Sequence, residues 1–432
     1  MREIGFVDVE SQPGDLAALQ DEAILRLGRL MNISVSENQS PNGKPANGAA
    51  YENYLAGVGY FERHDKPGNI DLAIDALERA VTTDPHFAIG FARLAEVYVM
   101  KYRLSFDARW LASAETYAKQ AAELDNRIPS PYVALGQIDE IGQHLDLAVT
   151  EFERALDLDP RDAEALAGLA DAYTKQGRLK EAEAAYLKAA TIRPTDWRGY
   201  NDLGIFYENT GRPREAIPQF EHALKLTPDN AWPYVNLALA YMALDDPKML
   251  AEAERALKKS ITISPTFGAY GDLALLYGEQ RRFHESAAAS MEALKLNDQS
   301  SDVWGNLADA YEWLGDKEKA RAARRKTIEL LERTIKLNPK NGQNQATLAA
   351  LYAKEGLEEK SIDSIHISLA LSENDPYILG QVAEAYEALG KRKEAIKYLE
   401  LALSKGLTRQ ELNGNFVIQA VLSDPGFKPP DK

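Results

Sequence analysis

The sequence predicts an all-α fold, a right-handed superhelical solenoid of about ten helix-turn-helix pairs with capping helices at both ends. Three observations lead to this prediction: a repeating period, paired amphipathic segments, and glycine or proline at the segment ends. Pro160, Pro194 and Pro228 lie 34 residues apart. Proline stops a helix because it lacks the N–H donor and clashes with the preceding turn. Each period therefore encloses one pair of helices.

The stretch from residue 200 to residue 228 shows the repeating unit most clearly. Leu203 and Tyr207 recur at helical spacing, which predicts an apolar face on a first helix. Gly211 ends that helix, because glycine tolerates the left-handed conformation found at many helix ends. Ala216 and Phe220 give the second helix its buried stripe. The small residues are expected to let the two helices approach closely.

The same positions recur along most of the chain. Moving back by 34 residues brings Leu169, Tyr173, Gly177 and Ala182 into register, and Tyr241 opens the next copy. This ladder of small and aromatic residues with a 34-residue period resembles the tetratricopeptide repeat. The resemblance implies stacked helix pairs with a concave inner face that binds other proteins.

We expect three regions along the chain. Residues 1–49 form an N-terminal region, which consists of a lead, a capping helix over residues 15–31 and a linker. Residues 50–406 form the repeat array, and residues 407–432 form a C-terminal capping helix and tail. The second helix of the eighth pair is seven residues longer than the others and should protrude. Arg281 stands where other repeats have glycine, which predicts a strained turn.

Composition limits the partners that the chain can have. Its formal net charge is -16, which argues against nucleic acid or an anionic membrane surface as the main partner. The chain has no cysteine, so it forms no disulfide. No apolar run is long enough to span a bilayer. We expect a soluble protein. The cytoplasm is the favoured compartment, and the alternative is the extracytoplasmic side of a membrane signalling protein.

No residue pattern predicts catalysis. The histidines are scattered and form no HExxH or other paired metal-ligand spacing. Gly57 and Gly59 make an isolated GxG without a third glycine or a preceding strand. We therefore expect no enzyme activity, no cofactor and no metal, because a fold without a site supplies no chemistry.

Polar side chains on the first helices are the candidate binding residues. They fall in two columns one helix turn apart, the first led by Asp202 and the second by Glu208. The residues predicted to contact a partner are Asn201, Asp202, Glu208, Asn236, Asp272, Asn306, Asp309, Glu312, Gln381 and Glu387. They predict an acidic groove for a basic or neutral protein or peptide segment. Each of them could instead be an ordinary solvated surface position.

The groove differs from the type of tetratricopeptide domain that clamps the C-terminal carboxylate of a chaperone. That type uses lysine and arginine, and we expect no such cluster on the inner face here. A chaperone C-terminus is therefore excluded as the expected partner.

The two ends of the chain carry a narrower resemblance. Gln20, Asp21 and Glu22, and later Tyr51 and Leu55, are similar to the start of the repeat region in bacterial multidomain signalling proteins. Those proteins join such repeats to a Ser/Thr kinase, a nucleotide cyclase or a winged-helix regulator. The resemblance implies a scaffold or sensor module in such a protein. The alternative is a structural module that oligomerises through the ends of the array.

Overall fold

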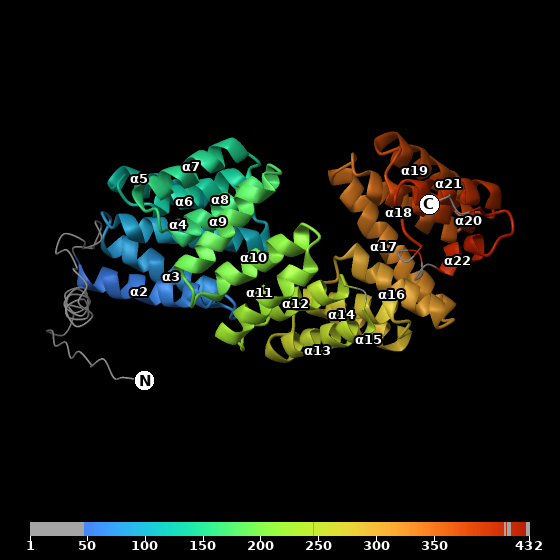
Figure 1. Cartoon of the computed structure of the whole chain (residues 1–432), viewed down its shortest axis with the longest axis horizontal. Coiled ribbons are helices and arrows are strands. Elements are labelled where there is room, and N and C mark those ends of the chain that lie inside the picture. The colour runs from blue at the N-terminus through green and yellow to red at the C-terminus, as the bar shows by residue number, and fades with distance from the viewer. Residues whose placement is uncertain (1–46, 245, 410–411, 413–415, 429–432) are drawn as a thin grey trace. The chain divides into compact units, whose positions relative to one another are not determined.

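The computed structural model describes residues 47–244, 246–409, 412 and 416–428, and every regular element among them is a helix (Figure 1). The expected lead helix at residues 15–31 lies outside this range. The chain divides into two compact units, residues 1–240 and 241–432. We call them the first unit and the second unit and describe each by itself.

In the first unit, five antiparallel helix pairs follow one another and lead into α12. Their bounds are α2 Gly48–Glu62, α3 Asn69–Thr83, α4 Ala88–Ser105, α5 Ala108–Leu124, α6 Ser130–Ile141, α7 Leu145–Leu158, α8 Ala163–Lys175, α9 Leu179–Ile192, α10 Trp197–Asn209, α11 Pro213–Leu226 and α12 Trp232–Met242.

In the second unit, α13 is followed by four antiparallel pairs and a short last helix. Their bounds are α13 Pro247–Ile263, α14 Phe267–Glu279, α15 Phe283–Leu296, α16 Ser301–Trp313, α17 Lys317–Leu337, α18 Gly342–Lys354, α19 Glu358–Leu371, α20 Pro376–Ala388, α21 Arg392–Ser404 and α22 Phe416–Leu422. The expected pattern of helix pairs is confirmed.

Polar caps start the first helices of the repeats. The Asp162 side chain accepts hydrogen bonds from Glu164 N and Ala165 N, both at 2.9 Å. Asn230 accepts from Trp232 N at 3.0 Å. These oxygens satisfy donors of the first turn that have no partner within the helix. The register predicted from the prolines is therefore the register of the structure.

Small residues set the distance between the two helices of a pair. At Gly204 in α10, an added Cβ atom would lie 2.5 Å from a ring carbon of Phe220 in α11. The Phe220 side chain is fully buried, as are Ala216 and Ala223 on the same face of α11. Glycine at residue 204 thus lets the aromatic ring lie directly against the helix backbone.

Two predicted irregularities and one insertion within a helix pair can be described from the structure. Arg281 takes the place of the turn glycine with φ 58°, in the left-handed region, so the predicted strain is present. Helix α17 runs for 21 residues, against 14 for α15, which confirms the seven-residue extension. The insertion at residues 101–109 is mostly helical, because α4 continues to Ser105 and α5 begins at Ala108.

The C-terminal end of the second unit is covered by α22 and the residues after it. Arg392 in α21 donates to the carbonyl oxygen of Ala420 and to Asp424, both at 2.9 Å. Phe427 is 8% exposed and belongs to the last hydrophobic core cluster. This segment therefore shields apolar groups that the last repeat would otherwise expose.

Candidate functional site

The first helices of the repeats bring their polar side chains together on the inner face of the first unit. They enclose a cavity of about 160 Å³. Its charged lining residues are Glu96, Arg103, Glu140, Glu164, Asp171, Arg193, Asp196, Arg198 and Asp202. Val99, Met100 and Phe152 supply apolar wall. The cavity thus combines charged groups and hydrocarbon in one partly enclosed space.

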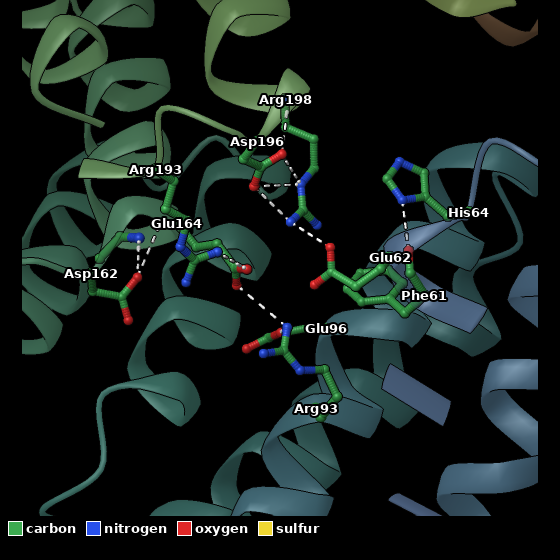
Figure 2. Close-up of polar contacts among 11 residues, drawn as sticks. Phe61, Glu62, His64, Arg93, Glu96, Asp162, Glu164, Arg193, Asp196 and Arg198 are labelled. Atoms are coloured by element: carbon green, nitrogen blue, oxygen red, sulfur yellow. Dashed lines mark hydrogen bonds and ion pairs between the residues drawn. The ribbon is translucent and has the colours of Figure 1, made fainter. Parts of the chain in front are cut away.

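One side of the cavity is a network of arginines and glutamates (Figure 2). Arg93 in α4 donates to Glu96 at 2.5 Å and lies 3.5 Å from Glu164 in α8. Arg193 donates to the other oxygen of Glu164 at 3.1 Å. Glu96 is only 4% exposed, so these charges are tolerated because they are paired.

The two glutamates of this network respond differently to burial. Burial raises the pKa of Glu96, and Arg93 only partly offsets it. Burial would also raise the pKa of Glu164, but Arg93 and Arg193 hold that pKa below its ordinary value. Glu164 is therefore the ionised partner of the two arginines, and Glu96 is the glutamate that takes up a proton more readily.

The other side of the cavity holds a second group of charges. Arg103 in α4 donates to Glu140 in α6 at 3.3 Å, and Lys175 in α8 forms an ion pair with the same glutamate. The Tyr186 hydroxyl donates to Asp171. Burial, reinforced by the nearby charge of Asp171, raises the pKa of Asp202 to about 7. This side carries more carboxylates than cations.

A contact between distant repeats closes the first unit on itself. Glu62 at the end of α2 pairs with Arg198 in α10 at 2.7 Å, although 136 residues separate them. In the turn after α2, Arg63 pairs with Asp229 at 2.8 Å and Lys66 pairs with it at 2.9 Å. We call this set of contacts, together with those of His64, the clasp.

His64 lies at the centre of the clasp. Its ring is 7% exposed, with ring centroids 5.9 Å from Trp197 and 5.2 Å from Trp232. Its Nδ1 atom is 2.9 Å from the carbonyl oxygen of Phe61, and Figure 2 shows this pair beside Arg198. Burial lowers the pKa of His64. The histidine therefore packs as a neutral ring between two tryptophans, which is the structural role that such an isolated residue most often has.

The second unit also gathers polar side chains on its first helices. Lys354 in α18 pairs with Glu384 in α20 at 2.9 Å and lies 3.7 Å from Asp309 in α16. The Asp309 side chain is 66% exposed. One lysine thus connects carboxylates from the repeats before and after its own, and Asp309 keeps most of its surface open to solvent.

The predicted binding residues are found on the first helices of both units. In the first unit, Asn236 donates to Asn201 at 2.8 Å, so residues one repeat apart meet. In the second unit, Thr347 donates to Gln381 at 3.2 Å across one repeat. These two bonds place neighbouring column members within reach of each other.

The remaining predicted residues differ in their ion pairs, their hydrogen bonds and their burial. Glu312 pairs with Arg324 at 3.0 Å, and Glu387 accepts two hydrogen bonds from Arg392. Asp272 is half-buried, and burial raises its pKa to about 6. Asp202 lines the cavity of the first unit, and the other predicted residues, Glu208 and Asn306, lie on α10 and α16.

The expectation of an inner face without an arginine cluster is wrong for the first unit. Arg103, Arg193 and Arg198 line its cavity, and Arg93 lies just behind it. The sequence reasoning followed only two columns of positions, and these arginines fall outside both. Arg93, Arg103 and Arg198 lie on first helices, whereas Arg193 follows the second helix α9, so the first helices alone do not show all four.

Comparisons with known proteins agree with this architecture. Models described as tetratricopeptide repeat match residues 142–196 and 272–330, residues 197–230, and residues 378–411. These segments are tetratricopeptide repeats. The repeats described between them share the same helix pairing, so the resemblance read from the 34-residue period is confirmed at this level.

A curated relative and two solved structures place the repeats among known examples. Cellulose synthase operon protein C of Xanthomonas axonopodis pv. citri is 39% identical over 74 residues, and this match spans 17% of the chain and 5% of the relative's length. Pseudomonas aeruginosa PilF is 19% identical, and the match covers 50% of this chain and 96% of the PilF chain, with a TM-score of 0.38. A human IFIT1 dimer with PPP-AAAA is 15% identical, and the match covers 91% of this chain and 88% of the IFIT1 chain, with a TM-score of 0.48.

The described residues contain neither a candidate metal site nor a candidate membrane-spanning helix. No group of three or more histidines and carboxylates there is arranged to hold a metal ion. No helix in that part of the chain combines the length and the apolar character needed to cross a bilayer.

Proposed function

We propose that the chain is a protein-interaction scaffold or sensor module, and that it binds a segment of a partner protein on the inner face of its second unit. Tetratricopeptide repeats generally mediate contacts between proteins, which supports the general class. The observation that carries the proposal is Asp309 of α16, a carboxylate whose side chain is 66% exposed beside Lys354 of the next repeat. Asp272 and Asn306 lie on the first helices of the same unit.

The charges of this face favour a basic or neutral partner segment. Three carboxylates, Asp272, Asp309 and Glu384, accompany one cation, Lys354. A lysine or arginine of a partner would return the pKa of Asp272 from about 6 towards its ordinary value, because a nearby positive charge favours the ionised form. Amide side chains such as Gln381 can bond the backbone of an extended segment.

We also propose that these repeats belong to a bacterial signalling or regulatory protein. This part of the proposal rests on the residues near Gln20 and Tyr51 that are similar to the start of such repeat regions. The repeats would then bind the partner segment, and an effector domain would respond to that binding.

Affinity capture from a bacterial lysate tests the binding face. The wild-type chain is compared with Asn306→Ala/Asp309→Lys and with Glu359→Lys, an exposed residue of α19. The proposal is supported by a protein that wild type and Glu359→Lys retain and that Asn306→Ala/Asp309→Lys does not. The purified partner should then bind wild type and Glu359→Lys with similar Kd values and the double variant with a higher Kd. Equal retention by all three variants would move the interface away from α16.

A second candidate function, self-association, is favoured by one observation. Leu337 is 89% exposed at the end of the extended helix α17. An exposed leucine of this kind can bury its surface against a second copy of the chain. Light scattering would show a mass that rises with concentration in wild type and not in Leu337→Glu. A constant monomer mass would remove this candidate.

A further inference from the structure

The cavity of the first unit differs from an open peptide groove. The clasp joins α2 to α10 and to Asp229, so the inner face is closed across its width by contacts between distant repeats. The enclosed space of about 160 Å³ corresponds to roughly ten water-sized volumes. It suits a small molecule better than a polypeptide.

The charges around the cavity do not balance. Arg193 is bound to Glu164, and Arg198 is bound to Asp196 and Glu62. Arg103 and Lys175 both face Glu140. Within the described part of the chain, Asp171 and Asp202 have no ion pair with a lysine or arginine, and Asp171 has only the Tyr186 hydroxyl. The lining as a whole contains three arginines and six carboxylates.

Hydrocarbon surface lies in the same cavity. Val99, Met100 and Phe152 form part of its wall, and Val99 and Phe152 are buried. Such a surface favours methylene groups over water. Two carboxylates without an ion pair to a lysine or arginine, arginine–glutamate pairs in the walls, and an apolar surface together define the ligand that would fit.

We propose that this cavity binds a small organic cation, an amine or guanidinium on a short aliphatic chain, with Asp202 and Asp171 as its carboxylate partners. The walls hold the methylene groups, and the clasp keeps the site closed to larger molecules. This site is separate from the partner surface of the second unit and goes beyond the proposed function.

The ionisation of Asp202 agrees with this assignment. Its pKa is raised to about 7 because burial and Asp171 outweigh the opposing effects of Asn201, Arg103 and Arg198. A cation bound there would remove both the repulsion between the two aspartates and the proton that Asp202 otherwise takes up. Binding of the cation should therefore release protons near neutral pH.

Titration calorimetry of the full chain with putrescine tests the proposal. Butanediol has the same carbon chain without charge, and succinate has the same length with negative charge. We expect putrescine to bind and to raise the melting temperature, and the other two to do neither. Asp202→Asn should weaken putrescine binding by about tenfold or more, because it removes a charged hydrogen-bond acceptor. Ala167→Leu should abolish it by filling the cavity, since Ala167 lines it.

Controls separate this site from the rest of the molecule. Asp272→Asn in the second unit should leave putrescine affinity unchanged, and circular dichroism should show that each variant is folded. Equal affinity for putrescine and butanediol would overturn the proposal, as would stronger binding of succinate or unchanged affinity in folded Asp202→Asn and Ala167→Leu. All these measurements use the chain without a protein partner, so failure of the scaffold proposal does not affect them.

Discussion

The two units use the same repeat and differ in how their inner faces are completed. In the first unit, Arg198 and Glu62 join helices that are 136 residues apart, and the charges of the inner face are enclosed with them. In the second unit, Lys354 connects carboxylates of the repeats before and after its own, and Asp309 stays 66% exposed. Closure by the clasp thus accompanies a cavity in the first unit, whereas in the second unit Lys354 and Glu384 are largely buried and Asp309 is exposed.

This difference has an energetic consequence. Charges enclosed in the first unit interact strongly, because less water screens them, but each must be paired to be tolerated. Charges on the second unit's inner face keep part of their hydration and can exchange it for a partner. The same repeat therefore gives a charged cavity in the first unit and a largely exposed carboxylate, Asp309, in the second.

The largest effects on the free energy of unfolding should come from truncating buried side chains in the hydrophobic cores. Each effect should stay within the unit that carries the substitution. Phe220→Ala and Ile365→Ala each remove a fully buried side chain, one from each unit. We expect losses in the free energy of unfolding of about 3–5 and 2–5 kcal/mol respectively. Hydrogen exchange measured by mass spectrometry should lose protection mainly in the mutated unit. Equal loss in both units from either change would show that they unfold as one body.

Opening the clasp should have the next largest effect. Arg198→Gln leaves Glu62 and Asp196 without their cation, and Arg198 is only 21% exposed. We expect the first unit to lose about 1–3 kcal/mol, with faster hydrogen exchange in α2 and α10. Arg333→Gln, which breaks an exposed pair with Glu329 within α17, is the matched control in the second unit. If both variants behave alike, the clasp contributes no special stability.

The pH dependence of the first unit should reveal Asp202. Its pKa is 3.8 ordinarily and about 7 in the folded chain, so the folded state binds the proton more tightly. Stability from this group is complete below about pH 4 and is lost as the pH rises through 7. Urea unfolding at several pH values should show this slope in wild type, and Asp202→Asn should reduce it without removing it, because the pKa values of Glu96 and Asp171 are also raised.

Protonation of His64 acts in the opposite direction and must be separated from that of Asp202. Burial lowers the pKa of His64 below its ordinary 6.5, so its contribution is present above that pH and is lost as the pH falls. In the Asp202→Asn background, the clasp should loosen on acidification below pH 6.5. A further His64→Phe change should remove this dependence. An unchanged slope would show that another group controls it.

The smallest effect concerns the turn at Arg281. This residue has φ 58° where Gly211, Gly315 and Gly356 occupy the equivalent turns with similar positive φ. Arg281→Gly relieves strain but removes a guanidinium that lies 5.4 Å from the centre of the Trp313 ring. We expect a net gain below about 1 kcal/mol in thermal unfolding. A clear loss would mean that the contact with Trp313 outweighs the strain.

Local residue patterns were sufficient to predict the repeats. The 34-residue spacing of the prolines, the glycine at residue 204 against Phe220, and the caps at Asp162 and Asn230 all act between residues close in sequence. Even the strained turn at residue 281 could be predicted, because one missing glycine is visible against its repeats. Such features follow from helix periodicity and backbone preference, which a linear sequence displays directly.

The tertiary structure decided what the inner faces became. Nothing in the sequence near Glu62 indicates that it meets Arg198, and nothing near Arg103 indicates that it faces Glu140. These pairings depend on the small rotation from one repeat to the next, which accumulates over several repeats until distant helices meet. The sequence by itself therefore determined the repeating unit, and the accumulated geometry of the stack determined which of its charges are enclosed.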